Sequence, residues 1–592
     1  MTQPVHDRAT GVNYDPSGGE RHAHKWGFTD TYFEFDSPST VRLAGNRYPL
    51  AGHTLPAFIP FVEAMLGIPL RAEDRQEERV DPAVPDTSAT GDLLEALEGA
   101  LDADQVSLDD RERLIHSHGQ LSVDEVYRIL YRDALERVVD VVVYPQSEED
   151  VRTLVELADR FDIVLIPYGG GTNVSGALAI PSQERRTVVS VDMQRMSRIL
   201  WIDEVNRQAC VEAGISGKEL EMALGTKGYT SGHDPDSVEL STLGGWIATN
   251  ASGMKKNRYG NIEDIVLEAT LVTPAGVVET LHITPRNSTG IQPRALLFGS
   301  EGNFGIVTKA VIKIHPRPEV QSYGSLVFPS FEKGVEFLHA LRKTGVLPAS
   351  IRLVNNNEFR FGQALQGEPT FWGSLRRRLQ RFVLFQLKNF DPKSLAACTI
   401  VMEGTAAEVA QQRRTIFPLA RSYGGISGGS SGGKRGYMLT FSIAYIRDFF
   451  NQYQILGETF ETSVPWSRIH DVTRSVTEEL ERQTKVHGVA GRPYLSYRLT
   501  QTYHTGVCIY FTMGFSGVGL DRADEVYHKI EQCLRQVILD QGGSLSHHHG
   551  VGKIRQQFLP QIQTEGSIKV LQELKKAVDP KNIFGARNGV FD

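Results

Sequence analysis

Pro167-Tyr168-Gly169-Gly170-Gly171-Thr172-Asn173-Val174-Ser175 is the stretch that decides the fold, and it directly follows the apolar, strand-like run 163–166. Three consecutive glycines pack poorly at the end of a strand, so they favour a place where another group approaches the backbone closely. Backbone amides in such a turn form a concave anion site, with short polar side chains at its rim. The stretch therefore predicts a cradle for a diphosphate group.

Two familiar phosphate loops are excluded by the same residues. The stretch lacks the Gly-Lys-Ser/Thr ending of a P-loop. It also lacks the Gly-x-Gly-x-x-Gly pattern, followed about 20 positions later by an acidic residue, that dinucleotide-binding domains use. Taken alone, the stretch is more often an ordinary glycine-rich turn. Segments elsewhere in the chain must therefore decide between such a turn and a diphosphate site.

The composition is that of a globular protein with more than one core. The chain has 592 residues, of which 40% are hydrophobic and 23% charged, and this length predicts two or three domains. A net charge of −8 argues against a general nucleic-acid-binding role. Cys210, Cys398, Cys508 and Cys533 show no metal-ligand spacing and suit a reducing compartment. We therefore expect no nucleic-acid partner and no metal.

The glycine stretch ends an alternating pattern of strands and helices. Residues 138–144 are β-branched and strand-like, residues 148–160 carry apolar residues at helical spacing, and 163–166 form a second strand. Helical spacing also marks 93–101 and 123–139. This order predicts that the domain begins with a strand–helix–strand unit of the α/β type.

Two later segments have the composition of ligand walls. Residues 232–253 are dense in small and hydroxyl-bearing residues but too apolar to be disordered, and residues 298–308 place glycines around the start of a strand. From about Pro318, strand-like and helix-like segments predict a second α/β domain with an antiparallel sheet. Residues 421–437 are rich in Gly and Ser and predict a mobile loop.

A basic, aromatic-rich stretch interrupts the second domain at residues 371–390. Arginines alternate there with large apolar residues, which is typical of an amphipathic segment at a membrane surface. A solvated helix packed on its own domain is the alternative. The stretch predicts either peripheral membrane contact or an ordinary amphipathic helix.

Four pieces of these segments, in this order, resemble the flavin site of the vanillyl-alcohol-oxidase/PCMH-type FAD-binding fold: 167–176, 236–242, 249–252 and 301–307. In that family the diphosphate lies on the first segment, and the second and third wall the flavin ring. The resemblance implies an α+β fold class: an FAD-binding domain of this type, an α/β cap domain with an antiparallel sheet, and a helical N-terminal extension. The FAD-binding residues that it implies are Pro167, Tyr168, Gly169, Gly170, Gly171, Thr172, Asn173, Asp236, Ser237, Val238, Glu239, Leu240, Ser241, Thr242, Thr249, Asn250, Ala251, Ser252, Glu301, Gly302, Asn303, Phe304, Gly305, Ile306 and Val307.

Pieces from about residue 25 to 589 resemble the alkyldihydroxyacetonephosphate synthases, the flavoenzymes that form the ether bond of ether lipids. Ser544–Lys553, with three adjacent histidines, is the most specific piece. The resemblance implies exchange of the acyl group of acyl-dihydroxyacetone phosphate for a long-chain fatty alcohol, through a flavin N5 adduct and without net redox. It also implies non-covalently bound FAD, with His233 the only nearby residue to check for a covalent link.

Particular residues take roles from the same resemblance. Tyr510 corresponds to the catalytic tyrosine that removes a proton beside the ketone, and a free phenol, with a pKa near 10, needs neighbouring cations to do so. Arg447 corresponds to the residue that binds substrate, where a guanidinium can grip a phosphate, and Arg352 to an arginine essential for activity. The loop residues with an implied role in phosphate binding and proton transfer are His547, His548 and His549.

Simpler interpretations stay open at each of these positions. Tyr510 could be an ordinary strand tyrosine, and Arg447 could form a surface ion pair with Asp448. The three histidines could be a structural cluster, whereas metal ligation is disfavoured because alternate side chains of an extended segment point apart. For the whole protein, the alternative functions are an FAD-dependent 2-hydroxy-acid dehydrogenase or oxidase on the same scaffold, and a flavin-loaded membrane scaffold.

The predicted domains are a largely helical N-terminal extension (1–134), the FAD-binding domain (135–317), the cap or substrate domain (318–560) and a C-terminal segment that returns to the FAD-binding domain (561–592). We expect a homodimer. Eukaryotic members of the family are peroxisomal, but no peroxisomal or secretory signal is recognisable here. The predicted compartment is therefore a bacterial-like cytoplasm, with the peroxisome as the alternative for a eukaryotic source.

Overall fold

The computed structural model describes the chain except for residues 1–4, 7–12, 15–18, 49, 80–81, 133–134, 368–384, 387 and 592. The chain forms two compact units. Unit 1 comprises Met1–His22, Trp26–Glu78 and Pro318–Ser544, and unit 2 comprises Ala23–Lys25, Arg79–Arg317 and Leu545–Asp592. Residues 545–560, expected in the cap domain, therefore lie with the FAD-binding domain in unit 2.

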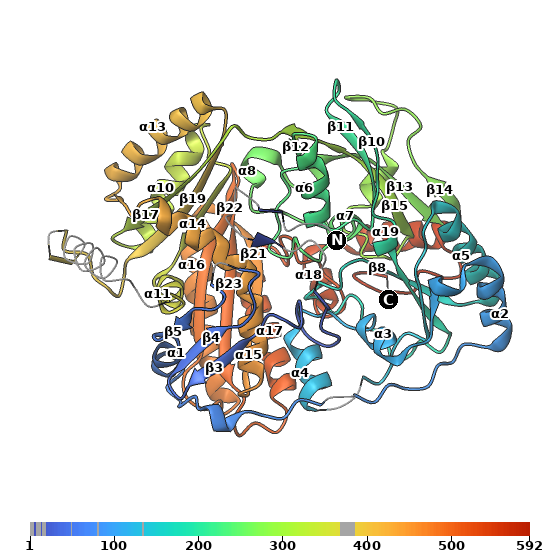
Figure 1. Ribbon diagram of the computed structural model, residues 1–592, viewed down its shortest axis with the longest axis horizontal. Helices are drawn as coiled ribbons and strands as arrows, with labels where there is room; N and C mark the ends of the chain where they lie inside the picture. Colours follow the sequence, from blue (N-terminus) through green and yellow to red (C-terminus); the bar gives the residue numbers. More distant parts are fainter. Residues whose placement is uncertain are drawn as a thin grey trace. The chain divides into compact units, whose positions relative to one another are not determined.

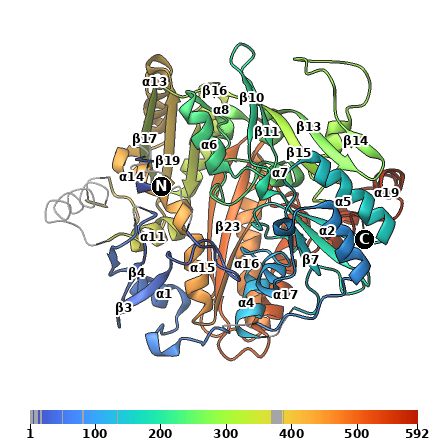
Figure 2. The same cartoon turned by 45° about the vertical axis from the view of Figure 1, so that its right-hand side comes forward.

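Unit 2 begins with a mostly parallel four-stranded sheet. Its order is β6 (Val106–Ser107), β7 (Val141–Val143), β9 (Val188–Asp192), β8 (Val164–Tyr168), and β7 and β8 both run parallel to β9. Helix α5 (Glu148–Phe161) connects β7 to β8 and buries one apolar face, next to α2 (Gly91–Ala100) (Figures 1 and 2). Ser147 caps α5 by accepting a hydrogen bond from the amide of Asp150. The predicted strand–helix–strand entry is present.

A second sheet of unit 2 is antiparallel and has five strands. Its order is β10 (Ile199–Asp203), β11 (Gln208–Glu212), β15 (Ile306–Lys313), β13 (Val266–Thr273), β14 (Gly276–Val278). A core of Leu, Ile and Val side chains joins this sheet to α6 (Gly217–Thr226), α7 (Leu243–Thr249) and α9 (Ile262–Ile265). The remaining elements of unit 2 are α3 (Asp110–Ile115), α4 (Val123–Tyr131), β12 (Tyr229–Thr230), α8 (Lys256–Tyr259), β16 (His315–Pro316), α18 (Leu559–Ile562) and α19 (Glu565–Val578).

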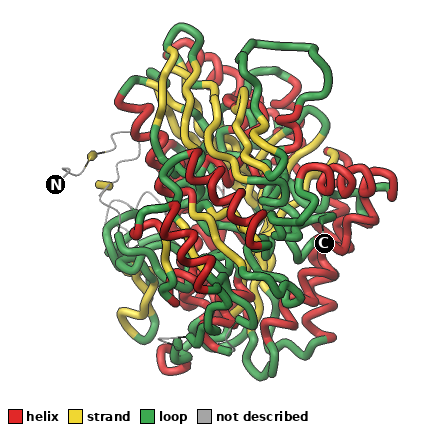
Figure 3. Tube along the Cα trace, turned by 90° about the vertical axis from the view of Figure 1, so that its right-hand side faces the viewer, coloured by secondary structure: helices red, strands yellow, loops and turns green. Residues whose placement is uncertain are grey.

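Unit 1 is built on a seven-stranded antiparallel sheet. Figure 3 draws the strands of both units in yellow and the helices in red. The sheet of unit 1 has the order β20 (Ile426–Ser427), β17 (Val320–Phe328), β19 (Ala396–Gly404), β18 (Ser350–Val354), β22 (Tyr494–Thr502), β23 (Gly506–Ser516), β21 (Ile455–Pro465). Its other elements are β1 (Val5–His6), β2 (Asn13–Tyr14), β3 (Phe33–Ser37), β4 (Thr40–Leu43), β5 (Thr54–Leu55), α1 (Phe58–Leu66), α10 (Phe331–Lys343), α11 (Asn356–Ala364), α13 (Ala406–Ser422), α14 (Ser430–Met438), α15 (Ala444–Asn451), α16 (Ile469–Val486) and α17 (Ala523–Asp540). The predicted antiparallel sheet of the second domain is confirmed.

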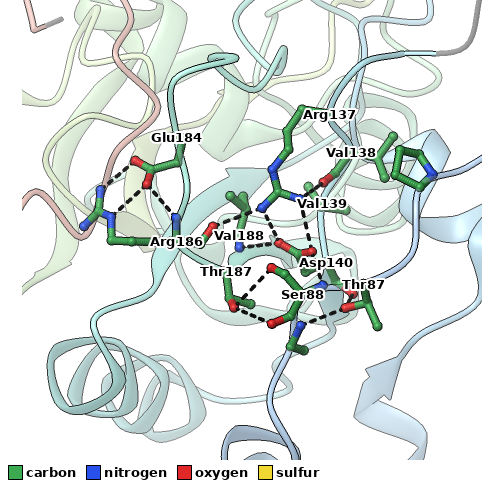
Figure 4. Close-up of polar contacts among 12 residues, drawn as sticks. Thr87, Ser88, Arg137, Val138, Val139, Asp140, Glu184, Arg186, Thr187 and Val188 are labelled. Carbon is green, nitrogen blue, oxygen red and sulfur yellow. Dashed lines mark hydrogen bonds and ion pairs between the residues drawn. The ribbon is translucent and has the colours of Figure 1, made fainter.

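The carboxylate of Asp140 ties three chain segments of unit 2 together (Figure 4). It accepts hydrogen bonds from the amide of Ser88 at 2.7 Å, from the amide of Val188 at 2.8 Å and from the guanidinium of Arg137 at 2.7 Å. Its side chain is fully buried. Burial alone would raise the pKa of Asp140, but these hydrogen bonds outweigh it and lower the pKa. The ionised carboxylate thus joins the segment before α2 to β9.

Two secondary-structure predictions are corrected. The helix expected over 123–139 ends with Tyr131 in α4, because Val138 and Val139 are fully buried in the extended approach to β7. The loop expected at 421–437 contains most of α14, which packs so closely on β17 that a Cβ at Gly433 would overlap the carbonyl oxygen of Gly324. The glycines that suggested mobility therefore permit close helix–sheet packing.

The stretch expected to contact membranes, 371–390, falls largely outside the described residues. Among the helices that the structure describes, none combines the length and the apolar character needed to cross a bilayer.

Candidate functional site

The four segments expected to bind FAD converge within unit 2. We name them by their order: the first is 167–173, the second 236–242, the third 249–252 and the fourth 301–307. A side chain at Gly170 would overlap the carbonyl oxygen of Leu240, so the first and second segments are in direct contact. The amide of Glu301 donates to the carbonyl of Ala248 at 2.9 Å, which joins the fourth segment to the residue just before the third.

The first segment forms a backbone cradle with a buried hydroxyl beside it. The carbonyl oxygen of Gly171 accepts from the amide of Gln120 at 2.9 Å, and that of Gly169 accepts from the side chain of Gln194 at 2.9 Å. Ser175 is fully buried, and within the described residues its hydroxyl has no hydrogen-bond partner. An unpartnered buried hydroxyl is costly, so a polar ligand against this loop fits the residues present.

Hydroxyl groups of the second and third segments are already engaged by the protein. Ser241 accepts from the indole nitrogen of Trp246 at 2.8 Å. Thr242 caps α7 by accepting from the amide of Gly245, and Thr249 donates to the carbonyl of Gly245 at 2.9 Å. These bonds hold the wall in one arrangement before any ligand binds.

His233 lies buried next to the second segment. Its ring is 4.5 Å from that of Trp246, and neither ring nitrogen has a hydrogen-bond partner among the described residues. Burial, helped by the nearby His548, lowers the pKa of His233 to about 3. The imidazole is therefore neutral at neutral pH.

The triple-histidine loop, residues 545–553 of unit 2, gathers its three imidazoles. The Nδ1 atoms of His547 and His548 are 2.8 Å apart, and the rings of His548 and His549 are 4.5 Å apart. The prediction of an extended segment with side chains pointing apart is wrong, because the backbone bends through these residues. A hydrogen bond between two ring nitrogens needs one donor and one acceptor, so this pair shares a proton.

The triple-histidine loop is anchored directly after the predicted diphosphate cradle. The amide of Lys553 donates to the carbonyl of Ser175 at 3.0 Å. Arg555, which is buried, donates to the carbonyl of Gly550 at 2.6 Å and to that of Val174 at 3.2 Å. Sequence reasoning missed Arg555, because nothing in its local pattern marks a contact with residues so far back in the chain.

Tyr510 lies on β23 of unit 1 beside an arginine that sequence reasoning also missed. The strand register pairs Tyr510 with Arg498 of β22, whose guanidinium lies 4.2 Å from the centre of the phenol ring. Glu358 of α11 accepts from Arg498 at 2.8 Å, and the Tyr510 hydroxyl donates to Thr459 at 3.0 Å. Arg498 therefore places a cation over the ring of the tyrosine that the resemblance implies as the base.

Arg447 and Arg352 are both buried in unit 1. Arg447, on α15, forms a 2.5 Å ion pair with Asp448, which also accepts from the amide of Trp26 at 3.1 Å. The ion pair of Arg447 is therefore buried, and the interpretation as a surface pair is wrong. Arg352, on β18, donates to the hydroxyl of Thr440 at 2.6 Å. Both guanidinium groups are thus held at defined places.

The predicted site residues divide between the two units. Unit 2 brings the four segments expected to bind FAD together with the triple-histidine loop, although more than 370 positions separate that loop from the predicted diphosphate cradle. Unit 1 carries Tyr510, Arg352 and Arg447. Each unit therefore holds one distinct set of groups.

Two domain families match this chain. The FAD binding domain matches residues 139–282, and the C-terminal domain of FAD linked oxidases matches residues 317–588. The protein is therefore a flavoprotein of the FAD-linked oxidase class, with FAD as its cofactor.

Individual relatives narrow the class. The chain is 40% identical to alkyldihydroxyacetonephosphate synthase of Caenorhabditis elegans, over 95% of this chain and 94% of the relative. It is 34% identical to the protein of the same name from Dictyostelium discoideum, over 82% and 78% of the two chains. A solved structure of alkyldihydroxyacetonephosphate synthase superimposes with a TM-score of 0.83 at 29% identity, covering 95% of this chain and 98% of the other. The chain belongs to the alkyldihydroxyacetonephosphate synthase family, which confirms the resemblance and the predicted fold class.

Proposed function

We propose that this protein exchanges the acyl group of acyl-dihydroxyacetone phosphate for a long-chain fatty alcohol, which forms an alkyl ether and releases a fatty acid. Membership of the family supports the reaction class. The structural observation that carries the proposal is the anchoring of three gathered imidazoles to the diphosphate cradle of an FAD site. A plain oxidase needs a flavin and a base, whereas this exchange must also move protons to and from two different leaving and entering oxygens.

The four segments of unit 2 would hold FAD, with its diphosphate on residues 167–173 and its ring against residues 236–242 and 249–252. When bound, FAD supplies a ring that can react covalently with carbon, so that a substituent can be exchanged without net redox. The protein's own contribution is to orient the substrate and to hold protons at stated atoms.

Tyr510 would act as the base that removes the proton beside the ketone, with Arg498 favouring its phenolate. Arg447 would bind the substrate phosphate, because a guanidinium offers two parallel donors to its oxygens. Arg352 would support activity from its buried place on β18. The paired ring nitrogens of His547 and His548 would hold the proton that the leaving carboxylate or the entering alcohol exchanges.

The test is an exchange assay with the FAD-loaded protein. Acyl-dihydroxyacetone phosphate and hexadecanol are supplied without an electron acceptor, and alkyl product and released fatty acid are counted. We expect one fatty acid for each alkyl product. No product from protein with full flavin occupancy would overturn the proposal, and anaerobic bleaching of the flavin by D-lactate or glycolate would favour a 2-hydroxy-acid dehydrogenase instead.

Homodimer formation, peripheral membrane contact through residues 371–390 and a cytoplasmic location belong to the same proposal. Sedimentation tests the homodimer, and liposome flotation with residues 371–390 deleted tests the membrane contact. Cell fractionation tests the location, and none of these measurements depends on the chemistry.

A further inference from the structure

We propose that Glu301 is the positioning residue of the triple-histidine loop and couples the place of the histidines to the fourth FAD-binding segment. This inference rests on the proposed function, because it assigns the support of that same site. The Oε1 atom of Glu301 accepts from the amide of Val551 at 3.1 Å and from that of Gly552 at 3.0 Å. The Oε2 atom accepts from Gly552 at 3.1 Å. Both carboxylate oxygens are therefore committed to the loop.

The backbone of Glu301 is bound in other directions. Its amide donates to Ala248, and its carbonyl oxygen accepts from the side chain of Asn588 at 2.9 Å. Its φ of 44° lies in the left-handed region, where glycine or asparagine is the usual residue. A glutamate held in this conformation indicates that its side chain, rather than its backbone freedom, is what the position requires.

The charges around the carboxylate support the same role. Burial raises the pKa of Glu301, and the amides of Gly552 and Val551 with the cations Arg555 and Lys553 act against this rise. Those cations lie on or directly after the loop, and Lys553 also donates to the side chain of Asn588 at 2.8 Å. Opposite charges therefore draw the loop toward the fourth segment.

The consequence of removing the carboxylate is specific. The amides of Val551 and Gly552 lose their acceptors two to three residues after His549, so the imidazoles lose their fixed positions. Glu301 is among the residues expected to bind FAD, but its two carboxylate oxygens accept from the loop, and its backbone bonds to Ala248 and Asn588 do not depend on the side chain. The FAD-binding segments should therefore keep their arrangement. Turnover should fall while FAD binding and substrate binding change little.

The test compares Glu301→Ala and Glu301→Gln in the FAD-loaded, full-length protein. We expect the Ala variant to show at least about 10-fold faster hydrogen exchange at residues 550–553 and at least about 10-fold lower kcat, with KM and flavin occupancy within about twofold. Glu301→Gln keeps one acceptor oxygen, so its hydrogen-exchange rate and its kcat should lie between those of the wild type and those of Glu301→Ala. Glu212→Gln is the matched control, because Glu212 is another buried carboxylate of unit 2, paired with Arg198 at 2.6 Å.

Unchanged exchange at residues 550–553 in Glu301→Ala would overturn the inference, as would a loss of kcat that only matches a loss of bound FAD. If the Ala variant does not fold, the Gln variant gives the same two readouts. Hydrogen exchange is measured without substrate, so it tests the role of Glu301 even if the wild-type protein makes no alkyl ether. That second result would overturn the proposed function alone.

Discussion

At the scale of single residues, Tyr510 offers the sharpest test of the chemistry. Tyr510→Phe keeps the ring under Arg498 and removes only the hydroxyl that bonds Thr459. If this hydroxyl is the base, turnover should fall by about 100-fold or more, while flavin absorbance shows normal FAD content. Tyr494→Phe on β22 is the control and should keep activity within about threefold, because Tyr494 takes no part in the proposed chemistry. Near-normal turnover of the Tyr510 variant would exclude it as the base.

Glu125, on the first turn of α4, should make stability depend on pH. Burial, helped by the charge of Asp124, raises its pKa from 4.5 to about 7, although the amide of Gly119 donates to it. Because the pKa of Glu125 is higher in the folded than in the unfolded protein, its contribution to stability is fully present below about pH 4.5. This contribution is lost as the pH rises through 7.

The variant Glu125→Gln should therefore be more stable than the wild type at pH 8, by up to about 3 kcal/mol, and equally stable near pH 4.5. Melting temperatures at pH 4.5, 6 and 8 measure this difference. A stabilisation that is larger at pH 4.5 than at pH 8 would contradict the assignment.

At the scale of elements, Asp140 holds the segment before α2 against β9 (Figure 4). Asp140→Ala leaves the guanidinium of Arg137 and two buried amides without their acceptor, so we expect a loss of about 3–5 kcal/mol in unfolding free energy. Urea denaturation at neutral pH measures it. Asp159→Ala removes a half-exposed carboxylate that pairs with Lys581, and it should cost less than about 1 kcal/mol. Equal losses in the two variants would show that the Asp140 network does not join these elements.

At the scale of the whole molecule, the two units should respond differently to FAD. Every predicted FAD-binding residue lies in unit 2, and a ligand that binds only the folded form at 100 times its Kd adds about 2.7 kcal/mol. Calorimetry of the apoprotein with added FAD should therefore show a transition that moves up by several degrees. If FAD moved every transition by the same amount, or moved none with binding confirmed by flavin absorbance, the prediction that FAD stabilises unit 2 selectively would be wrong.

Local patterns predicted much of the fold, and their failures have physical causes. The helix expected over 148–160 is α5 (Glu148–Phe161), and the strand expected over 163–166 overlaps β8 (Val164–Tyr168), because the apolar spacing of each lies within the element itself. Helix α14 was missed because its glycines serve packing against a strand about 100 residues earlier. The bend that gathers the histidines was missed because its anchors come from residues 174, 175 and 301.

The sequence by itself determined the cofactor, the fold class and the family, because each depends on motifs whose residues are neighbours in the chain. Only the tertiary structure decided which groups support those motifs. Arg498 lies over the ring of Tyr510, and Arg555 and Glu301 form hydrogen bonds with the triple-histidine loop. The ion pair of Arg447 is buried rather than exposed. The physical reason is distance along the chain. Glu301 and Val551 are 250 positions apart. Their hydrogen bond forms only when both segments pack in unit 2, so no local sequence pattern predicts it.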